Sequence, residues 1–295
     1  MKQPLVSVIM PSFNHAKYIE ESIKSVINSN YRNIELLIID DGSKDNTFEI
    51  AEKILEKQNT LTGYYLERQK NCGIVKTLNK LIEKSNGEYI TILASDDMLT
   101  PNGITDRVLY LEENKTIDAV FGKAFLINHN GYIVALNASK YLYRADEKLL
   151  KSKYLKSELI LRWSAVGPCL LVRRNLYDKI GLYDEKYHTE DKDFYLRMLA
   201  VDKIKYIDSI VAMYRVHTAN VSRNLKTKTG NRIECAKINV VQSKLFESVI
   251  LYVYLRSYKV DDLFLRKNFI FMYIIYKILR YCIVAIYLFL LKMNI

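Results

Sequence analysis

Two adjacent carboxylates, Asp96 and Asp97, are the sharpest chemical feature of this sequence. They follow the apolar segment Tyr89–Leu93, which is typical of a buried strand. Carboxylates placed side by side repel each other unless a cation or hydrogen-bond donors balance their charge. Mg²⁺ and Mn²⁺ prefer oxygen ligands and are often held by one or two carboxylates together with substrate phosphates. The pair therefore indicates either a divalent metal site or an ordinary turn that caps the next helix.

Two more polar clusters also follow apolar segments. Pro11-Ser12-Phe13-Asn14 comes after the β-branched run Val6–Met10, and Asp40-Asp41-Gly42-Ser43 comes after Glu35–Ile39. By itself, Asp-Gly is a common turn. In parallel sheets, however, ligands bind beyond the carboxyl ends of the strands. We therefore expect the three clusters to meet at one edge of a sheet and to form one site.

The segments that position these clusters alternate between strand and helix patterns. Strands are expected at residues 6–10, 35–39, 64–66 and 89–93, and helices at 18–27, around 50–55 and at 77–83. This alternation predicts an α/β fold with a doubly wound, mostly parallel sheet, in which Pro11 ends the first strand. Residues 120–215 have a mixed pattern, and the chain from about residue 224 favours helix. We therefore expect a catalytic domain of residues 1–223 and a helical C-terminal region of residues 224–295.

Taken together, the motifs of residues 4–222 resemble those of glycosyltransferase family 2, an inverting family with the GT-A fold. The matching motifs, in chain order, are Val6-Ser7-Val8-Ile9-Met10-Pro11-Ser12-Phe13-Asn14, Ile38-Ile39-Asp40-Asp41-Gly42-Ser43, Asn71-Cys72-Gly73 with Asn79, Gly87-Glu88-Tyr89-Ile90, Ala94-Ser95-Asp96-Asp97, Gly181-Leu182-Tyr183-Asp184-Glu185, Glu190-Asp191-Lys192-Asp193-Phe194 and Tyr214-Arg215-Val216-His217. Each motif alone is common, whereas the ordered set is specific to the family.

The resemblance implies a Rossmann-like nucleotide half, an acceptor half and a role for individual residues. A divalent metal, Mn²⁺ or Mg²⁺, would be held by Asp97 and His217. The nucleotide-sugar would contact Pro11, Ser12, Phe13, Asn14, Asp40, Asp41, Lys76 and Asp96. Among these, Asp41 would bind the base and Asp96 the ribose. Lys76 is included because this chain has Thr77-Leu78 where relatives often carry an Ala-Arg pair.

The implied reaction needs one carboxylate near the acceptor. Asp191 would be the general base that takes the proton of the attacking hydroxyl, and Glu190 and His188 would contact the acceptor. The metal would neutralise the charge that develops on the departing nucleoside diphosphate. Without the resemblance, the acidic run at 190–193 would be interpreted as the first turn of a solvated helix.

The charge distribution indicates an anionic partner. Lys and Arg number 44 against 33 Asp and Glu, a net charge of +11, and no acidic residue follows Asp262. Residues 268–291 are mainly apolar, but their longest uncharged stretch, Tyr281–Leu291, has 11 residues, whereas a membrane-spanning helix needs about 20. We interpret this tail as a helix lying on an anionic membrane surface. A core helix, a homodimer contact and a true membrane span are the alternatives.

The expected location is the cytoplasm, peripheral at the inner face of the cell membrane. No signal-peptide pattern precedes the strand at Val6, and the four cysteines lack metal-ligand spacing. Family members of this size often extend lipid-linked saccharides. The resemblance thus implies an undecaprenyl diphosphate-linked acceptor in bacterial O-antigen or capsule synthesis, with a donor that is usually linked to UDP. The alternative is a non-catalytic family member that acts as a scaffold in polysaccharide assembly.

Other nucleotide-using classes fit the sequence less well. An NAD-dependent oxidoreductase carries G-x-G-x-x-G after its first strand, and a P-loop NTPase carries G-x-x-x-x-G-K; neither motif occurs here. The glycine-rich basic loop of nucleotidyltransferases is also missing. No nucleic-acid-binding motif accompanies the basic residues, so we expect no nucleic-acid partner.

Overall fold

A computed structural model describes residues 3–162, 165–187, 189–217, 234–235, 237–239, 241–245, 278, 281–282, 284–286 and 289. The strands are β1 (Val6–Ser12), β2 (Ile34–Asp40), β3 (Gly63–Arg68), β4 (Tyr89–Ile92), β5 (Met98–Leu99), β6 (Ala119–Ile127), β7 (Ile133–Ala135), β8 (Leu170–Arg173) and β9 (Ile204–Arg215). The α-helices are α1 (Ile19–Ile27), α2 (Thr47–Leu55), α3 (Ile74–Lys84), α4 (Gly103–Glu113), α5 (Ala138–Tyr143), α6 (Glu147–Leu150), α7 (Leu155–Arg162), α8 (Asn175–Ile180) and α9 (Glu190–Ala200). Among the described residues, short 3₁₀ helices cover Gly167–Cys169 and Ser243–Leu245.

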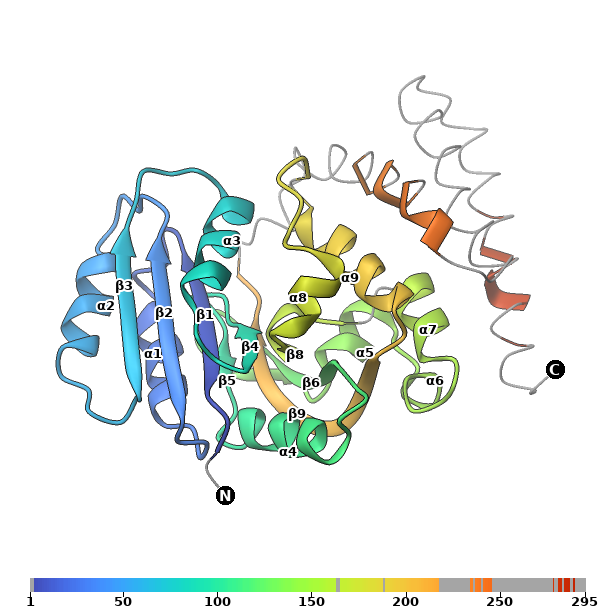
Figure 1. The fold of residues 1–295 in the computed structure, drawn as a ribbon, viewed down its shortest axis with the longest axis horizontal. Helices are drawn as coiled ribbons and strands as arrows, with labels where there is room; N and C mark the ends of the chain where they lie inside the picture. The colour runs from blue at the N-terminus through green and yellow to red at the C-terminus, as the bar shows by residue number, and fades with distance from the viewer. Residues whose placement is uncertain are drawn as a thin grey trace. The chain divides into compact units, whose positions relative to one another are not determined.

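The described strands form one nine-stranded sheet (Figure 1). Its order is β3-β2-β1-β4-β8-β6-β9-β5, and β7 pairs with β6 outside this path. β3, β2, β1 and β4 are parallel, which confirms the α/β alternation expected for the first hundred residues. Beyond β4 the sheet is mixed, because β8 runs antiparallel to β4 and β6 whereas β9 runs parallel to β6. This mixed part corresponds to residues 120–215, whose sequence pattern is also mixed.

β1 continues through Pro11, where the sequence predicted that it would end. Pro11 pairs with Ile39 of β2, whereas the pairing of β1 with β4 has already stopped at Ile9 and Ile92. Proline has no backbone N–H to donate, and a strand tolerates it where one side lacks a partner strand. The first polar cluster therefore begins inside the strand. It lies next to the point where the strand order reverses between β1 and β4, which is where α/β sheets bind ligands.

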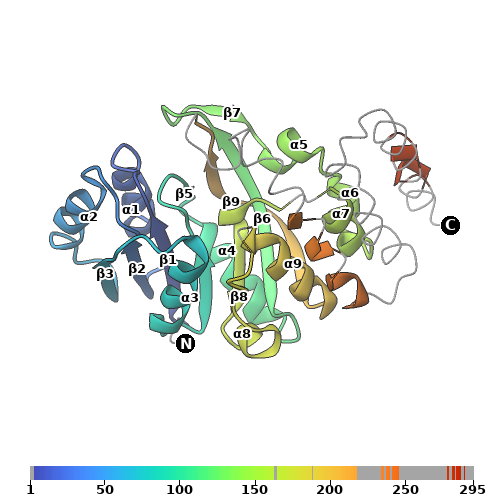
Figure 2. The same ribbon diagram turned by 90° about the horizontal axis from the view of Figure 1, so that it is seen from above.

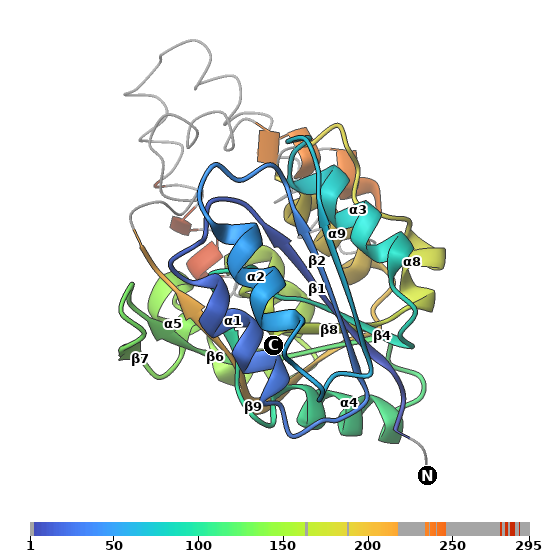
Figure 3. The ribbon, with the colours of Figure 1, turned by 90° about the vertical axis from the view of Figure 1, so that its left-hand side faces the viewer.

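Helices cover both faces of the parallel part of the sheet. α1 and α2 lie side by side on one face, and α3 packs on the other face against β1 and β2 (Figures 2 and 3). In α1 the buried residues Ile19, Ile23 and Val26 form one stripe, as the sequence predicted. Burying a side chain of this size contributes about 1.5–3 kcal/mol, so packing of this stripe holds α1 and the loop before it on the sheet.

Contacts group the chain into two compact units. The first unit comprises Met1–Ala145, Ser164–Glu185 and Lys203–His217 and contains the whole described sheet. The second unit comprises Asp146–Trp163, Lys186–Asp202 and Thr218–Ile295 and contains α6, α7 and α9. The boundary predicted near Arg223 lies outside the described residues and stays a prediction.

The apolar C-terminal segment, residues 268–291, lies mostly outside the described residues. Its one described core contact is made by Val284, which packs in the second unit with Leu149, Tyr154 and Leu161. This contact favours the core-helix alternative at that residue, and the predicted membrane-surface helix stays a prediction. Among the helices that the structure describes, none is both long and apolar enough to cross a membrane.

Candidate active site

The three predicted clusters meet at one edge of the sheet in the first unit. β1, β2 and β4 are parallel, and β9 points the same way through its pairing with β6, so all four strands end at this edge. Hydrogen bonds join the loops that follow them. The backbone N–H of Asn14 donates to Ser43 Oγ (2.8 Å), and His15 Nδ1 lies 2.8 Å from Ser95 Oγ. The expectation of one composite site is therefore supported by direct contacts.

The loop after β1 presents an aromatic ring to solvent. Asn14 adopts a left-handed conformation (φ 54°), which asparagine tolerates better than most residues. Its side-chain Oδ1 accepts a hydrogen bond from the N–H of Lys44 (2.8 Å), which fixes the turn. The ring of Phe13 is left 43% exposed, although a ring of this size is usually buried. The ring of Phe13 is therefore available for the contact with the nucleotide-sugar that the resemblance implies.

The remaining predicted nucleotide contacts differ in accessibility. Ser12 and Asp40 are buried, and Asp40 Oδ1 accepts a hydrogen bond from the N–H of Ser43 (2.9 Å). Pro11 is partly exposed, and Lys76 is exposed on α3. Ser12 and Asp40 thus shape the loops from inside, whereas Lys76 is open to a ligand.

Asp41 holds the loop between β3 and α3, residues 69–73, at the site. Its Oδ1 accepts hydrogen bonds from Gln69 Nε2 (2.8 Å) and from the N–H of Cys72 (2.9 Å), and its Oδ2 accepts one from the N–H of Gly73 (2.9 Å). Each carboxylate oxygen can accept two hydrogen bonds, so Oδ2 retains an acceptor position for a ligand. Asp41 therefore has a structural role beside the predicted contact with the base.

The turn at Gly42 gives a stability prediction. Gly42 has a φ of +80°, and an added Cβ would lie 3.0 Å from the backbone N of Asn71. We expect Gly42→Ala to lower the free energy of unfolding by about 1–3 kcal/mol in urea denaturation. Gly63→Ala is the matched control, because nothing lies within 4 Å of its added Cβ. An equal loss in both variants would contradict this explanation.

His15, Asp96 and His217 form a cluster whose possible ligand atoms all lie within 4.8 Å of one another. His217 Nε2 lies 2.9 Å from Asp96 Oδ2, and His15 Nδ1 lies 3.9 Å from Asp96 Oδ1. The rings of Tyr18 and His217 lie against each other, with centroids 4.8 Å apart. Burial is the main effect on His15 and lowers the pKa of its imidazole, which favours the neutral form that binds metals.

Asp97 is not a member of this cluster. It is 2% exposed, and its Oδ1 accepts a hydrogen bond from the N–H of Arg215 (2.8 Å). Burial, and next the charge of Asp96, raise the pKa of Asp97 well above its usual range. The neighbouring carboxylates therefore differ in role: Asp96 faces the two imidazoles, whereas Asp97 joins the turn to β9.

Arg215 connects the Asp96-Asp97 turn to α1. Its guanidinium is buried and donates from Nε to the backbone oxygen of Asp96 (2.7 Å) and from a terminal nitrogen to Glu21 Oε2 (2.5 Å). It also lies over the ring of Tyr18, 5.0 Å from the centroid. Hydrogen bonds that involve charged groups contribute about 1.5–3 kcal/mol each. Arg215 therefore fixes the position of Asp96.

The second unit contains the predicted base, Asp191, in the first turn of α9. The residue is exposed to solvent, but the protein atoms around its carboxyl group desolvate it and so raise its pKa. The hydrogen bond from the N–H of Lys192 partly offsets this rise. The second acid of the motif, Asp193, is 1% exposed and accepts hydrogen bonds from Arg197 Nε (2.9 Å) and Gln242 Nε2 (2.6 Å). Asp193 is thus a structural anchor, whereas Asp191 is available for chemistry.

The predicted acceptor contacts are less defined. Glu190 begins α9, and His188 lies outside the described residues. Their roles stay predictions, as does the proximity of Asp191 to the site of the first unit.

Sequence reasoning missed His15 and the positioning role of Arg215. His15 is not among the site residues predicted from the sequence, although it directly follows the Pro11–Asn14 motif. That adjacency was the available signal. Asn79 is in the motif set for a structural reason, because its side chain donates to Tyr183 O (2.9 Å) and accepts from Tyr183 N–H (3.0 Å).

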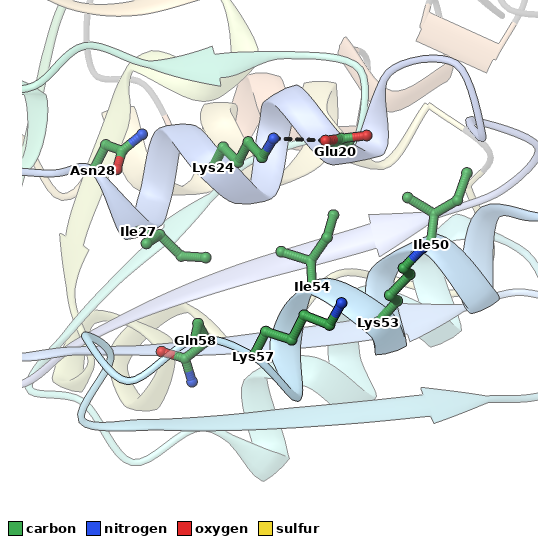
Figure 4. Close-up of a pocket in the computed structure, with 9 residues that line it drawn as sticks. All are labelled: Glu20, Lys24, Ile27, Asn28, Ile50, Lys53, Ile54, Lys57 and Gln58. Carbon is green, nitrogen blue, oxygen red and sulfur yellow. Dashed lines mark hydrogen bonds and ion pairs between the residues drawn. The ribbon is translucent and has the colours of Figure 1, made fainter.

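A groove of about 520 Å³ lies between α1 and α2, on the face of the sheet that these two helices cover (Figure 4). Ile27, Ile50 and Ile54 give it an apolar surface, and Lys24 pairs there with Glu20 (2.6 Å). The residues lining it are Glu20, Lys24, Ile27, Asn28, Ile50, Lys53, Ile54, Lys57 and Gln58. None of them belongs to the loops at the sheet edge, so we do not assign the reaction to this groove.

Comparison with protein families decides the class of the chain. The model described as glycosyl transferase family 2 matches residues 7–181, more than half of the sequence. The chain belongs to this family. The glycosyltransferase is 33% identical over 223 residues to an uncharacterised glycosyltransferase of Rickettsia typhi, which covers 74% of this chain and 66% of the relative. It is 30% identical over 221 residues to one of Methanocaldococcus jannaschii, covering 73% and 72%.

Some relatives are much longer than the region shared with this glycosyltransferase. The chain matches only 36% of a Rickettsia felis glycosyltransferase, at 30% identity. It is 24% identical to the glycosyltransferase GlyG of Streptococcus pneumoniae over 229 residues, 74% of this chain and 73% of GlyG.

Solved structures confirm the GT-A fold of the glycosyltransferase. S. aureus TarS in complex with UDP superposes with a TM-score of 0.60 at 20% identity, covering 82% of this chain and 69% of TarS. The mannosyltransferase PcManGT of Pyrobaculum calidifontis, in complex with GDP-Man and Mn²⁺, has a TM-score of 0.61 at 18% identity, covering 90% and 70%. At these identities the likeness concerns the fold.

Proposed function

We propose that this glycosyltransferase uses a nucleotide-sugar donor and a divalent metal, and that it inverts the anomeric centre of the transferred sugar. The observation that carries the proposal is the convergence of His15, Asp96 and His217 at the sheet edge. Phe13 and the loop held by Asp41 lie at the same edge, where α/β sheets bind nucleotides.

The cluster fits a divalent ion. Two ligand atoms in adjacent positions around an ion with bonds of about 2.1 Å lie about 3 Å apart. His217 Nε2 and Asp96 Oδ2 lie 2.9 Å apart, a hydrogen-bond distance that is also compatible with this spacing. A mixed set of imidazole and carboxylate suits a transition-metal ion better than Mg²⁺, which prefers oxygen ligands alone. We therefore assign the ion to Asp96, His217 and His15, in place of the Asp97 and His217 pair predicted from the sequence.

Each group has a role in the proposed reaction. When bound, the ion supplies positive charge to the leaving diphosphate. Phe13 offers its ring to the base, Asp41 Oδ2 accepts from a base N–H, and Lys76 reaches the phosphates. Asp191 takes the proton of the acceptor hydroxyl, for which its raised pKa suits it. TarS has been solved with UDP and with UDP-GlcNAc, and PcManGT with GDP-Man; we propose a UDP-linked donor, the base most usual in the family.

For the acceptor we propose a lipid-linked saccharide of bacterial O-antigen or capsule synthesis, carried on undecaprenyl diphosphate. The excess of 11 positive charges supports an enzyme that works against an anionic membrane and a diphosphate carrier. We propose that the enzyme acts at the cytoplasmic face of the membrane.

A thermal-shift panel of nucleotide-sugars, with and without Mn²⁺ or Mg²⁺, tests the donor proposal. A ligand that binds only the folded state stabilises it by about 2.7 kcal/mol at a hundredfold excess over Kd. We expect a metal-dependent rise in Tm for one nucleotide class, larger with Mn²⁺ than with Mg²⁺. If no donor raises Tm under either metal, the scaffold alternative replaces the enzyme proposal. A transfer assay that finds free sugars better acceptors than a lipid diphosphate-linked sugar would contradict the acceptor assignment alone.

A further inference from the structure

The arm formed by β7 and the helix α5 that follows it exposes an unusual concentration of apolar side chains. Five of the sixteen large hydrophobic side chains that are exposed among the described residues lie within residues 132–141. We call them the β7–α5 surface: Tyr132 (69% exposed), Ile133 (52%), Val134 (49%), Leu136 (71%) and Tyr141 (64%). Clustered exposed apolar residues of this kind mark interaction sites, whereas scattered ones need no explanation.

Within this stretch of the sequence the charged residues have one sign, and an acidic side chain, Glu21 of α1, comes near its start at Gly131. No aspartate or glutamate occurs between Asp118 and Asp146, whereas Lys140 and Arg144 are exposed beside the apolar residues. Elements that lie at the surface of an anionic bilayer have this composition: tyrosine at both ends, aliphatic residues between them, and lysine or arginine alongside. We infer that the β7–α5 surface docks on an anionic lipid bilayer.

The backbone of the arm limits how deeply it enters. β7 pairs only with β6 in the part of the chain that the structure describes, so the N–H and C=O groups on its other edge have no partner strand there. Such groups cost several kcal/mol each in hydrocarbon but are satisfied among lipid headgroups. The contact is therefore shallow, at the depth that tyrosine prefers.

The arm is tied directly to the candidate active site. Arg215, which donates to the backbone oxygen of Asp96 (2.7 Å), also donates to the backbone oxygen of Asn128 in the turn between β6 and β7 (3.3 Å). Figure 2 shows β7 extending along one end of β6, apart from β1, β2 and β3. A bilayer bound by this arm lies beside the edge where the proposed ion and donor sit, close to the diphosphate of a lipid-linked acceptor.

Vesicle binding of the full chain tests the inference. Sedimentation is measured with phosphatidylcholine vesicles that contain about 30% phosphatidylglycerol, and with pure phosphatidylcholine. We expect binding to the anionic vesicles, reduced at least tenfold by the double variant Ile133→Ser/Leu136→Ser and about fivefold or more by Lys140→Glu. The controls, Leu109→Ser on α4 and Lys53→Glu on α2, change residues that are also exposed but lie elsewhere, and these variants should bind as the wild type does.

Three results would overturn the inference: no vesicle binding by the wild type, unchanged binding by the double variant, or a double variant that alters only the oligomeric state in light scattering. The second result would assign membrane contact to another segment, and the third would indicate a protein partner.

Tyr132→Trp gives a measurement that does not depend on removing side chains. Its added fluorescence should shift to the blue on anionic vesicles, and no shift counts against the contact. The inference rests on the proposed function, because a bilayer contact would bring the enzyme to its lipid-linked acceptor. The vesicle assays contain neither donor nor acceptor, so their failure would leave the transferase proposal standing.

Discussion

Asp191→Asn is expected to reduce sugar transfer about 10²- to 10⁴-fold, the usual contribution of a positioned general base. The amide keeps the size of the carboxylate but cannot take the proton of the acceptor hydroxyl. In the proposed mechanism Asp191 contacts the acceptor and not the donor, so the rise in Tm with nucleotide-sugar and Mn²⁺ should remain. The measurement is kcat/KM for transfer together with the thermal shift.

The pH dependence of the reaction gives an independent check on Asp191. A general base acts only when deprotonated, so the rate falls as the pH drops through its pKa. Because desolvation raises the pKa of Asp191, the acid limb of kcat/KM should lie above the value of about 3.9 for an ordinary aspartate. Asp193→Asn is the matched control: it should lower stability, since Asp193 binds Arg197 and Gln242, without moving that limb. An active Asp191→Asn variant with an unchanged pH profile would remove Asp191 from the mechanism.

Asp96→Asn is expected to have the second large effect, on the metal. Asp96 is the carboxylate shared by both imidazoles of the cluster. Its loss should weaken Mn²⁺ binding by at least about 100-fold, since even residues that only support a ligand contribute 10- to 100-fold. Transfer at a fixed Mn²⁺ concentration should fall in parallel. Calorimetric titration of Mn²⁺ in the presence of UDP measures the affinity.

Asp97→Asn separates the two possible assignments of the metal. An asparagine at this position can still accept the hydrogen bond from the N–H of Arg215, so the turn should keep its shape. If Asp96 is the ligand, Asp97→Asn binds Mn²⁺ nearly as well as the wild type. If Mn²⁺ binding is instead lost in Asp97→Asn and kept in Asp96→Asn, the assignment drawn from the sequence is right and the one proposed here is wrong. His15→Asn should give an intermediate loss of Mn²⁺ affinity and a smaller preference for Mn²⁺ over Mg²⁺.

The parallel half of the sheet could be predicted from the sequence because its strands are short apolar runs that end in turns. In β2, for example, Leu36–Ile39 are buried on both faces of the sheet, so local composition is sufficient. The mixed half could not be predicted, because pairing between β6 and β9 joins residues such as Ala119 and Ile204 that are far apart in the sequence. No local pattern specifies such a pair.

The candidate site, like the sheet, could be predicted only in part. Its loops and acids follow from the strand ends, whereas the orientation of each carboxylate does not. Asp96 and Asp97 are adjacent and of the same type, and only the position of Arg215, which binds the backbone of one and the side chain of the other, distinguishes them. The contribution of His15 likewise depends on a contact with Ser95, 80 residues away.

β9, which carries Arg215 and leads to His217, is the last described strand of the sheet in chain order, but it lies between β6 and β5. It must therefore insert between two strands that the ribosome releases long before it. Contacts between residues so far apart in the sequence form slowly, because the intervening chain loses entropy before they stabilise it. A nascent chain that ends before residue 204 contains the loops for a nucleotide but lacks Arg215 and His217. Assembly of the metal cluster is thus expected to be a late folding event, and a newly made chain acquires its proposed reactivity only when β9 is in place.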